Sequence, residues 1–217
     1  MSDSAAGSPK AEWWNLPNKI TLSRIALAFV LFILLSLELA EVSLFGDRST
    51  ALWVVAVLFT ICVSTDWIDG MLARKLNLVT AFGRIADPFA DKLLVLGSLI
   101  FLIPISPYIA PWFVVVLLAR EFLVSALRSY LESRGIPFGA RWGGKIKMIL
   151  QSILIPWVFV VEALELAEGE GAFWRWGAIV LVYSTLAATL ISLADYLRVA
   201  QGANPKSANA SAGKNSS

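Results

Sequence analysis

The 217-residue chain contains no histidine and only one cysteine. Without histidine it cannot form a Ser-His-Asp triad, a Cys-His pair or a His-ligated zinc site. Phospholipase-D-like enzymes, whose nucleophile is histidine, are excluded for the same reason. Cys62 cannot form an intrachain disulfide and is expected to be a small core residue within an apolar run. Any metal must be held mainly by carboxylates, which favours hard cations such as Mg²⁺ or Mn²⁺.

Charged residues are also scarce, at 16% of the chain, where a soluble domain carries about 25%. Hydrophobic residues make up 58% and the mean hydropathy is +0.72, which predicts a polytopic membrane protein. We expect an all-α domain over residues 12–200, between disordered segments at 1–11 and 201–217, and no cleavable signal peptide. Each predicted transmembrane helix is near the ~20 residues that a bilayer core requires. The six are expected at 19–38, 50–73, 84–103, 111–132, 145–166 and 173–197.

The distribution of basic residues predicts how these helices are oriented. Fourteen of the 18 Lys and Arg residues fall on one side of the predicted spans, and only Arg48 and Arg175 fall on the other. The positive-inside rule then places both termini in the cytoplasm of a multi-pass protein of the cell inner (plasma) membrane. Lys92 and Arg120 fall within spans. The other polar residues near the membrane cluster at the cytoplasmic ends, which predicts a polar cavity that faces the cytoplasm.

Four aspartates next to long apolar runs indicate the site. Carboxylates at membrane depth are costly and usually functional. Asp66 and Asp69 are three residues apart and Asp87 and Asp91 are four apart, so each pair shares one helix face. Two antiparallel helices with facing carboxylate pairs can hold two divalent ions about 3.5–4 Å apart, and such ions clamp a diphosphate. Arg74 adds a bidentate donor for phosphate.

The full pattern, D-x2-D-G-x2-A-R-x8-G-x3-D-x3-D over residues 66–91, resembles the signature of the CDP-alcohol phosphotransferase family. The resemblance implies a six-helix, usually homodimeric membrane enzyme in which the four aspartates bind two Mg²⁺ or Mn²⁺ ions. It implies that Asp66 and Asp87 bridge the metals and that Asp91 is also the general base. The run from Asn18 to Arg24 resembles a second family element, although a polar cap at a helix start looks the same. The residues expected to bind the CDP-lipid are Asn18, Thr21, Gly70, Arg74 and Thr80.

Basic residues outside the signature suggest the acceptor. Arg120 and Arg128 can border one cavity, and with Lys145 and Lys147 they would form a basic pocket near the metals. Such a pocket suits an anionic acceptor, most simply a phosphate monoester, whereas choline or ethanolamine would need acidic or aromatic partners. The lysines and Arg128 could instead serve only as basic anchors at the membrane surface. Arg120 could instead pair with Glu121 of a neighbouring element.

The strings A-R-E-x3-S-A-L-R and G-K-x-K-x3-Q resemble the phosphatidylglycerophosphate synthase branch of the family, apart from Met148 where threonine is expected. The resemblance implies transfer of the phosphatidyl group of CDP-diacylglycerol to the 1-hydroxyl of sn-glycerol 3-phosphate, with release of CMP. It implies the lipid bilayer and a second copy of the chain as partners, and we expect no nucleic acid. The alternatives are another acceptor (inositol phosphate, serine or phosphatidylglycerol), a divalent-cation transporter and an inactive structural homologue.

Overall fold

The described residues form six α-helices and no strand, which confirms the all-α prediction. The computed structural model describes residues 16–42, 44–75, 81–134, 142–164 and 171–202, without the side chains at 16–19, 66–75, 81–85 and 201–202. The terminal segments predicted to be disordered lie outside these ranges, apart from residues 201 and 202. The helices are α2 (Leu16–Leu39), α3 (Arg48–Lys75), α4 (Ala81–Ile105), α5 (Pro111–Ser133), α6 (Trp142–Ala163) and α7 (Ala172–Gly202).

Apolar composition predicted six spans, and five of the six helices are long and apolar enough to cross a membrane. The exception is α5, whose 23 residues include four charged side chains. The charges at the middle of α5 point inward, since Arg120 is 5% exposed and Glu121 is 9% exposed. On the outer face of the same helix, Val115 and Phe122 are 63% and 66% exposed. α5 therefore has an apolar outer face and a charged inner face, as expected of a helix that lines a polar interior.

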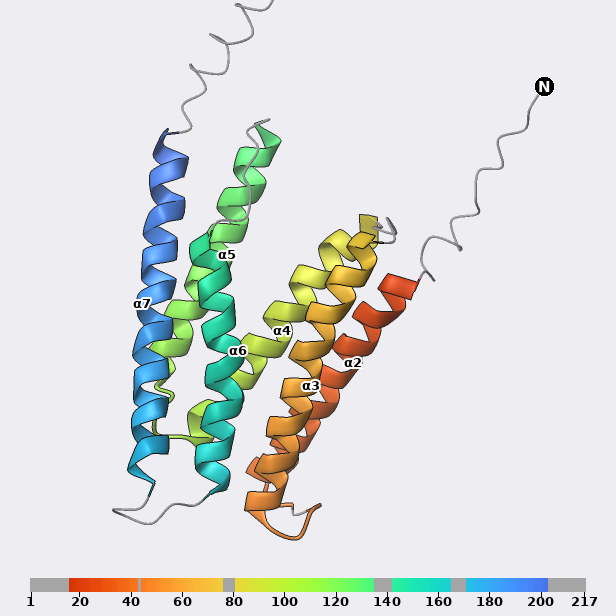
Figure 1. Ribbon diagram of the computed structural model, residues 1–217, viewed down its shortest axis with the longest axis vertical. Coiled ribbons are helices and arrows are strands. Elements are labelled where there is room, and N and C mark those ends of the chain that lie inside the picture. Colours follow the sequence, from red (N-terminus) through yellow and green to blue (C-terminus); the bar gives the residue numbers. More distant parts are fainter. Residues whose placement is uncertain (1–15, 43, 76–80, 135–141, 165–170, 203–217) are drawn as a thin grey trace, which may run out of the picture.

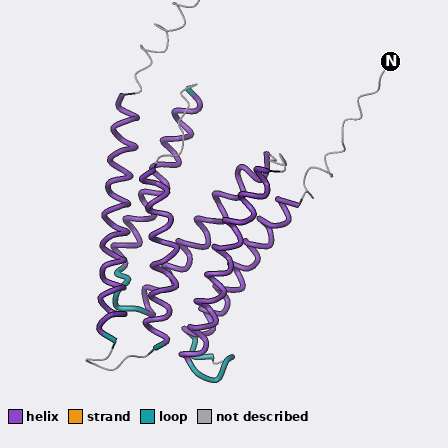
Figure 2. Tube along the Cα trace, in the orientation of Figure 1, coloured by secondary structure: helices purple, strands orange, loops and turns teal. Residues whose placement is uncertain are grey.

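The helices form two groups of three (Figure 1). In the first group α2 packs against α3 and α4, and in the second α7 packs against α5 and α6. Contacts of α3 with α6, and of α4 with α5 and α6, join the groups. The start of α2, the end of α3 and the start of α4 lie at one end of the bundle (Figure 1). Short loops lie at the opposite end (Figure 2). Residues far apart in sequence can therefore meet at one polar end.

The apolar core runs through both groups of helices. All six helices supply fully buried side chains, which include Leu31, Phe59, Leu99 and Phe159. Large apolar side chains also cover much of the outer surface, as Ile191 shows with an exposure of 67%. A soluble monomer rarely exposes so much contiguous apolar surface, whereas a lipid-facing surface requires it. The arrangement is that of a multi-pass membrane protein.

The start of α3 has a local polar cap at the other end of the bundle from the aspartates. The Thr50 backbone N–H and hydroxyl donate to the two carboxylate oxygens of Asp47, at 2.9 and 2.7 Å. These bonds, the side-chain bond first, hold the pKa of the fully exposed Asp47 below its ordinary value. An N-cap of this kind satisfies a backbone donor that the helix itself cannot.

A close approach of α6 and α7 gives a first testable prediction. A Cβ at Gly177 would lie 2.6 Å from the ring of Trp157. That ring cannot retreat easily, because its Nε1 donates to the Trp174 carbonyl at 3.0 Å and the two indoles lie 4.7 Å apart. We therefore expect Gly177→Ala to cost about 1–3 kcal/mol through overpacking, measured as a lower melting temperature in detergent. Gly144→Ala is the matched control, since its Cβ would meet its nearest atom at 3.6 Å, an ordinary contact. Equal stability of the two variants would contradict the packing argument.

Candidate active site

Two side chains of α2 contact the two aspartates of α4. The Thr21 hydroxyl donates to Oδ1 of Asp87 at 2.5 Å. The Arg24 guanidinium forms an ion pair with Oδ1 of Asp91 at 3.5 Å. Thr21 is 2% exposed and the Arg24 side chain 5%, while Asp87 is exposed and the Asp91 side chain is 36% exposed. Buried donors on α2 therefore hold carboxylates that solvent and ligands can still reach.

The spacing of these residues explains the pairing. α2 and α4 run in the same direction, because α3 lies between them in the chain and returns across the bundle (Figure 1). Thr21 and Arg24 are three residues apart, and Asp87 and Asp91 are four apart, so each pair lies on one helix face. Packing of the two faces brings both contacts into register.

The other predicted metal ligands lie close in the fold. Asp66 and Asp69 are in the C-terminal part of α3, and Asp87 and Asp91 are near the start of α4. Because only residues 76–80 separate these helices, both pairs are at the same end of the bundle (Figure 1). The side chains of Asp66 and Asp69 are outside the description, so the geometry of the full carboxylate set stays a prediction.

Four of the five predicted CDP-lipid-binding residues lie on α2 and α3 at this end of the bundle. Thr21 has a described side chain, and its contact with Asp87 places it beside the carboxylates. Asn18 is in the first turn of α2, and Gly70 and Arg74 are in α3, all at positions whose side chains are not described. Thr80 lies outside the described residues. Their predicted roles remain predictions.

The described donors suit a hard divalent cation. Asp87 and Asp91 offer carboxylate oxygens at the polar end of the bundle, and Thr21 offers a hydroxyl oxygen beside them. The one thiol, Cys62, is only 2% exposed, and the chain has no histidine. No group of three potential ligands comes together within the described side chains, a set that lacks Asp66 and Asp69. An oxygen-only donor set is what Mg²⁺ and Mn²⁺ prefer.

An apolar pocket of about 410 Å³ adjoins Asp91. Arg24 and Asp91 are its charged lining residues, and the rest of the wall is almost entirely apolar. It lies between α2, α3, α4 and α6, where the two groups of helices meet. The site therefore combines carboxylates with a cavity suited to hydrocarbon. The apolar and weakly polar wall is made by Cys62, Val63, Leu94, Val95, Met148, Ile149, Ser152 and Ile153.

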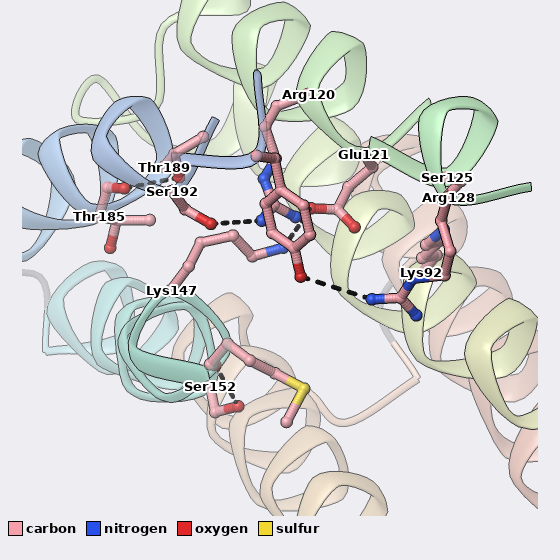
Figure 3. Close-up of polar contacts among 12 residues, drawn as sticks. Lys92, Arg120, Glu121, Ser125, Arg128, Lys147, Ser152, Thr185, Thr189 and Ser192 are labelled. Atoms are coloured by element: carbon pink, nitrogen blue, oxygen red, sulfur yellow. Dashed lines mark hydrogen bonds and ion pairs between the residues drawn. The ribbon is translucent and has the colours of Figure 1, made fainter. Parts of the chain in front are cut away.

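A buried ionic cluster lies between α5, α6 and α7 (Figure 3). Oε1 of Glu121 accepts from NH1 of Arg120 at 2.7 Å and also from Nζ of Lys147. NH2 of Arg120 donates to the Ser192 hydroxyl at 2.6 Å, and the Arg120 guanidinium lies 5.5 Å from the Tyr196 ring centroid. Arg120 and Lys147, two predicted acceptor ligands, thus share one carboxylate. The predicted pairing of Arg120 with Glu121 occurs, but within α5 itself and not with a neighbouring element.

Other basic residues lie around the cluster. NH2 of Arg128 donates to the Tyr196 hydroxyl at 3.4 Å, which links Arg128 to Arg120 through one aromatic ring. Nζ of Lys92, the residue after Asp91, donates to the hydroxyl of Ser125 on α5 (Figure 3). Lys145 is exposed and its Nζ lies 4.8 Å from the Trp142 ring centroid. The structure therefore brings three of the four predicted acceptor ligands together, and the described contacts of Lys145 lie elsewhere.

Several residues of the site were not predicted from sequence, although some left a signal. Arg24 lies three residues after Thr21 and so shares its helix face. Lys92 directly follows Asp91 within an apolar span. Ser192 and Tyr196 belong to a buried polar stripe on α7, with helical spacing, that also includes Thr185 and Thr189. These hydroxyl residues carry no charge, so their stripe was hidden within a long apolar segment.

The protein is of the class of all-α membrane bundles. It has acidic residues at one end and a buried basic cluster. The family model for CDP-alcohol phosphatidyltransferase matches residues 14–194. The chain is 46% identical over 147 residues to the CDP-diacylglycerol–glycerol-3-phosphate 3-phosphatidyltransferase of Bacillus subtilis (strain 168), covering 65% of this chain and 75% of that protein. Proteins of the same name from Salmonella choleraesuis (strain SC-B67) and Haemophilus influenzae (strain ATCC 51907 / DSM 11121 / KW20 / Rd) are 30% and 29% identical, each covering 87% of this chain and 96% and 95% of their own lengths.

The chain belongs to the CDP-alcohol phosphatidyltransferase family. The resemblance read from residues 66–91 is thereby confirmed. The family is generally dependent on divalent metal ions, which agrees with the oxygen donors at Thr21, Asp87 and Asp91.

Proposed function

We propose that the protein transfers the phosphatidyl group of CDP-diacylglycerol to the 1-hydroxyl of sn-glycerol 3-phosphate, which yields phosphatidylglycerophosphate and CMP. The position of Asp91 carries this proposal. Asp91 lines the apolar pocket, and the next residue, Lys92, bonds across to α5, the helix that contributes Arg120 and Arg128. Asp91 is therefore between a cavity suited to a lipid and a basic region suited to a phosphate. The named relatives support the choice of substrates.

In the proposed reaction, Asp91 accepts the proton of the acceptor's 1-hydroxyl as that oxygen attacks the β-phosphorus of CDP-diacylglycerol. A new bond forms between the acceptor oxygen and phosphorus, and the bond from phosphorus to the CMP oxygen breaks. CMP leaves with the electron pair of that bond. Arg24 orients the Asp91 carboxylate through Oδ1. General base catalysis of this kind contributes about 10²–10⁴-fold to a rate.

Two Mg²⁺ or Mn²⁺ ions, when bound, would supply positive charge beside the diphosphate and its leaving group. In this proposal Asp66, Asp69, Asp87 and Asp91 hold them. Thr21 supports the arrangement by fixing the Asp87 carboxylate through a buried hydroxyl. Asn18, Gly70, Arg74 and Thr80, with Thr21, are proposed to contact the CDP moiety.

The two substrates are proposed to approach the aspartates from different sides. The apolar pocket accommodates part of an acyl chain of the lipid, because its wall offers hydrocarbon contacts up to Asp91. The acceptor's phosphate is bound by Arg120, Arg128 and Lys147, with Lys145 as a further cation at the start of α6. The protein is proposed to be a homodimer in the cell inner membrane, with its termini and active site on the cytoplasmic side, as the distribution of basic residues predicts.

A cation transporter is the less favoured function. An ion path would need polar ligands that continue through the membrane beyond Asp91. The pocket wall beyond Asp91 instead consists of residues such as Cys62, Leu94 and Val95. This wall suits hydrocarbon and offers a divalent cation no carboxylate ligand.

The acceptor is tested by measuring CMP release from CDP-diacylglycerol by the purified protein with Mg²⁺. We expect rapid release with sn-glycerol 3-phosphate and only background release with inositol phosphate, serine or phosphatidylglycerol. Serine and phosphatidylglycerol lack the phosphate monoester that the basic cluster favours, and the names of the relatives favour glycerol 3-phosphate over inositol phosphate. Turnover with one of the other acceptors, and none with glycerol 3-phosphate, would reject the proposed acceptor but keep the proposed chemistry.

A further inference from the structure

The buried cluster between α5, α6 and α7 brings two cationic side chains onto one carboxylate. Arg120 and Lys147 both donate to Glu121 (Figure 3). Nearby, Arg128 donates to Tyr196 and Lys92 of α4 donates to Ser125 of α5. Arg120 and Lys147 are 5% and 6% exposed. Like charges at low solvent exposure repel strongly, so a cluster of this kind favours an additional anion. The cluster therefore resembles an anion-binding site in which the Glu121 carboxylate is the bound anion.

Glu121 occupies the position that a bound anion would take. A single oxygen, Oε1, accepts hydrogen bonds from Arg120 on α5 and Lys147 on α6. Nε of Arg120 and Nε of Arg128 are buried donors without a hydrogen-bond partner among the described residues. A phosphate has more acceptor oxygens and more charge than a carboxylate, so it can use these donors as well.

We propose that Glu121 is a positioning residue, whose carboxylate holds Arg120 and Lys147 until the phosphate of the acceptor replaces it. This inference rests on the proposed function. Glu121 acts through the two cations and does not touch the reacting atoms. It keeps the two cations, which come from different helices, close enough to share one anionic group before the acceptor arrives.

Competition with Glu121 explains how the site could select a phosphate. A phosphate monoester carries about −1.5 to −2 charge at pH 7, compared with −1 for a carboxylate. When an acceptor with a single negative charge replaces Glu121, the two cations exchange one singly charged partner for another. Such an acceptor therefore gains little binding free energy. A phosphate gains both charge and hydrogen bonds to the remaining donors. Removal of the Glu121 charge should therefore help weak anions and improve phosphate binding at the same time.

The test compares Glu121→Gln with the wild-type full-length protein in detergent. Glutamine keeps the size and one acceptor oxygen but removes the charge. We expect inorganic phosphate to bind about tenfold more tightly, measured by isothermal titration. We also expect a lower KM for glycerol 3-phosphate with no rise in kcat. The kcat/KM for glycerate, a monoanionic analogue with the same primary hydroxyl, should rise as well, but by a smaller factor, because its single charge gains less from the freed cations.

The matched control is Glu132→Gln, the same change at an exposed position of α5, which should leave all three quantities unchanged. If Glu121→Gln does not fold, Glu121→Asp replaces it, and its shorter reach should shift phosphate binding and the KM for glycerol 3-phosphate in the same direction by a smaller factor. Equal or weaker phosphate binding by the Glu121→Gln protein overturns the inference. A wild-type protein that releases no CMP with glycerol 3-phosphate rejects the proposed function instead, and the phosphate titration then still decides the role of Glu121.

Discussion

The Asp91→Asn protein is expected to release CMP about 10³-fold more slowly than the wild type. Asparagine has nearly the same shape as aspartate, but it cannot accept the proton of the attacking hydroxyl. It also loses the charge that pairs with Arg24, whose guanidinium is buried beside it. The measurement is the initial rate of CMP release with CDP-diacylglycerol and glycerol 3-phosphate, with folding checked by thermal unfolding.

Asp47→Asn is the matched control for that substitution. Asp47 caps α3 at the opposite end of the bundle, and asparagine is an equally good N-cap. The control should keep full activity. If Asp91→Asn retained wild-type activity while folded, Asp91 could not be the general base.

Removal of divalent metal is expected to have an equally large effect. Treatment with EDTA followed by dialysis should reduce CMP release to background, and Mg²⁺ or Mn²⁺ should restore it. The reason is the oxygen-only donor set at Thr21, Asp87 and Asp91, together with a chain that has no histidine and a buried cysteine. Oxygen donors bind hard cations but carry no positive charge themselves, so they cannot take the place of the cations beside a diphosphate.

A second readout of metal binding is thermal stability. A ligand that binds only the folded protein stabilises it by about 2.7 kcal/mol at 100 times its Kd. The melting temperature should therefore rise when Mg²⁺ or Mn²⁺ is returned to the metal-free protein, and rise less for Asp91→Asn. Full CMP release by protein freed of metal would contradict the proposed metal site.

The helices could be predicted from sequence because apolar runs of the right length have few alternatives in a bilayer. The largest difference in a predicted helix end is at α7, which was expected to end at residue 197 and ends at Gly202. The charged middle of α5 was read as part of a span, and its side chains do lie inside the bundle at Arg120 and Glu121. The apolar runs do not determine which face of each helix packs against which neighbouring helix.

The contacts of the site depend on that helix arrangement. The pairing of Arg24 with Asp91 requires α2 and α4 to be neighbours in register, and spacing along one helix does not specify this. Glu121 was considered only as a partner of Arg120, because its bond to Lys147 depends on the packing of α5 and α6. The polar end of the bundle was predictable from charge, whereas the individual partners required the fold.

The central claim is tested most directly by the mass of the lipid product. Purified protein would be incubated with CDP-diacylglycerol, Mg²⁺ and isotopically labelled sn-glycerol 3-phosphate, and the lipid fraction analysed by mass spectrometry. We predict a labelled lipid that carries two phosphates, in equal amount to the CMP released. A labelled lipid with a single phosphate, or CMP release without incorporation of the label, would contradict the proposal.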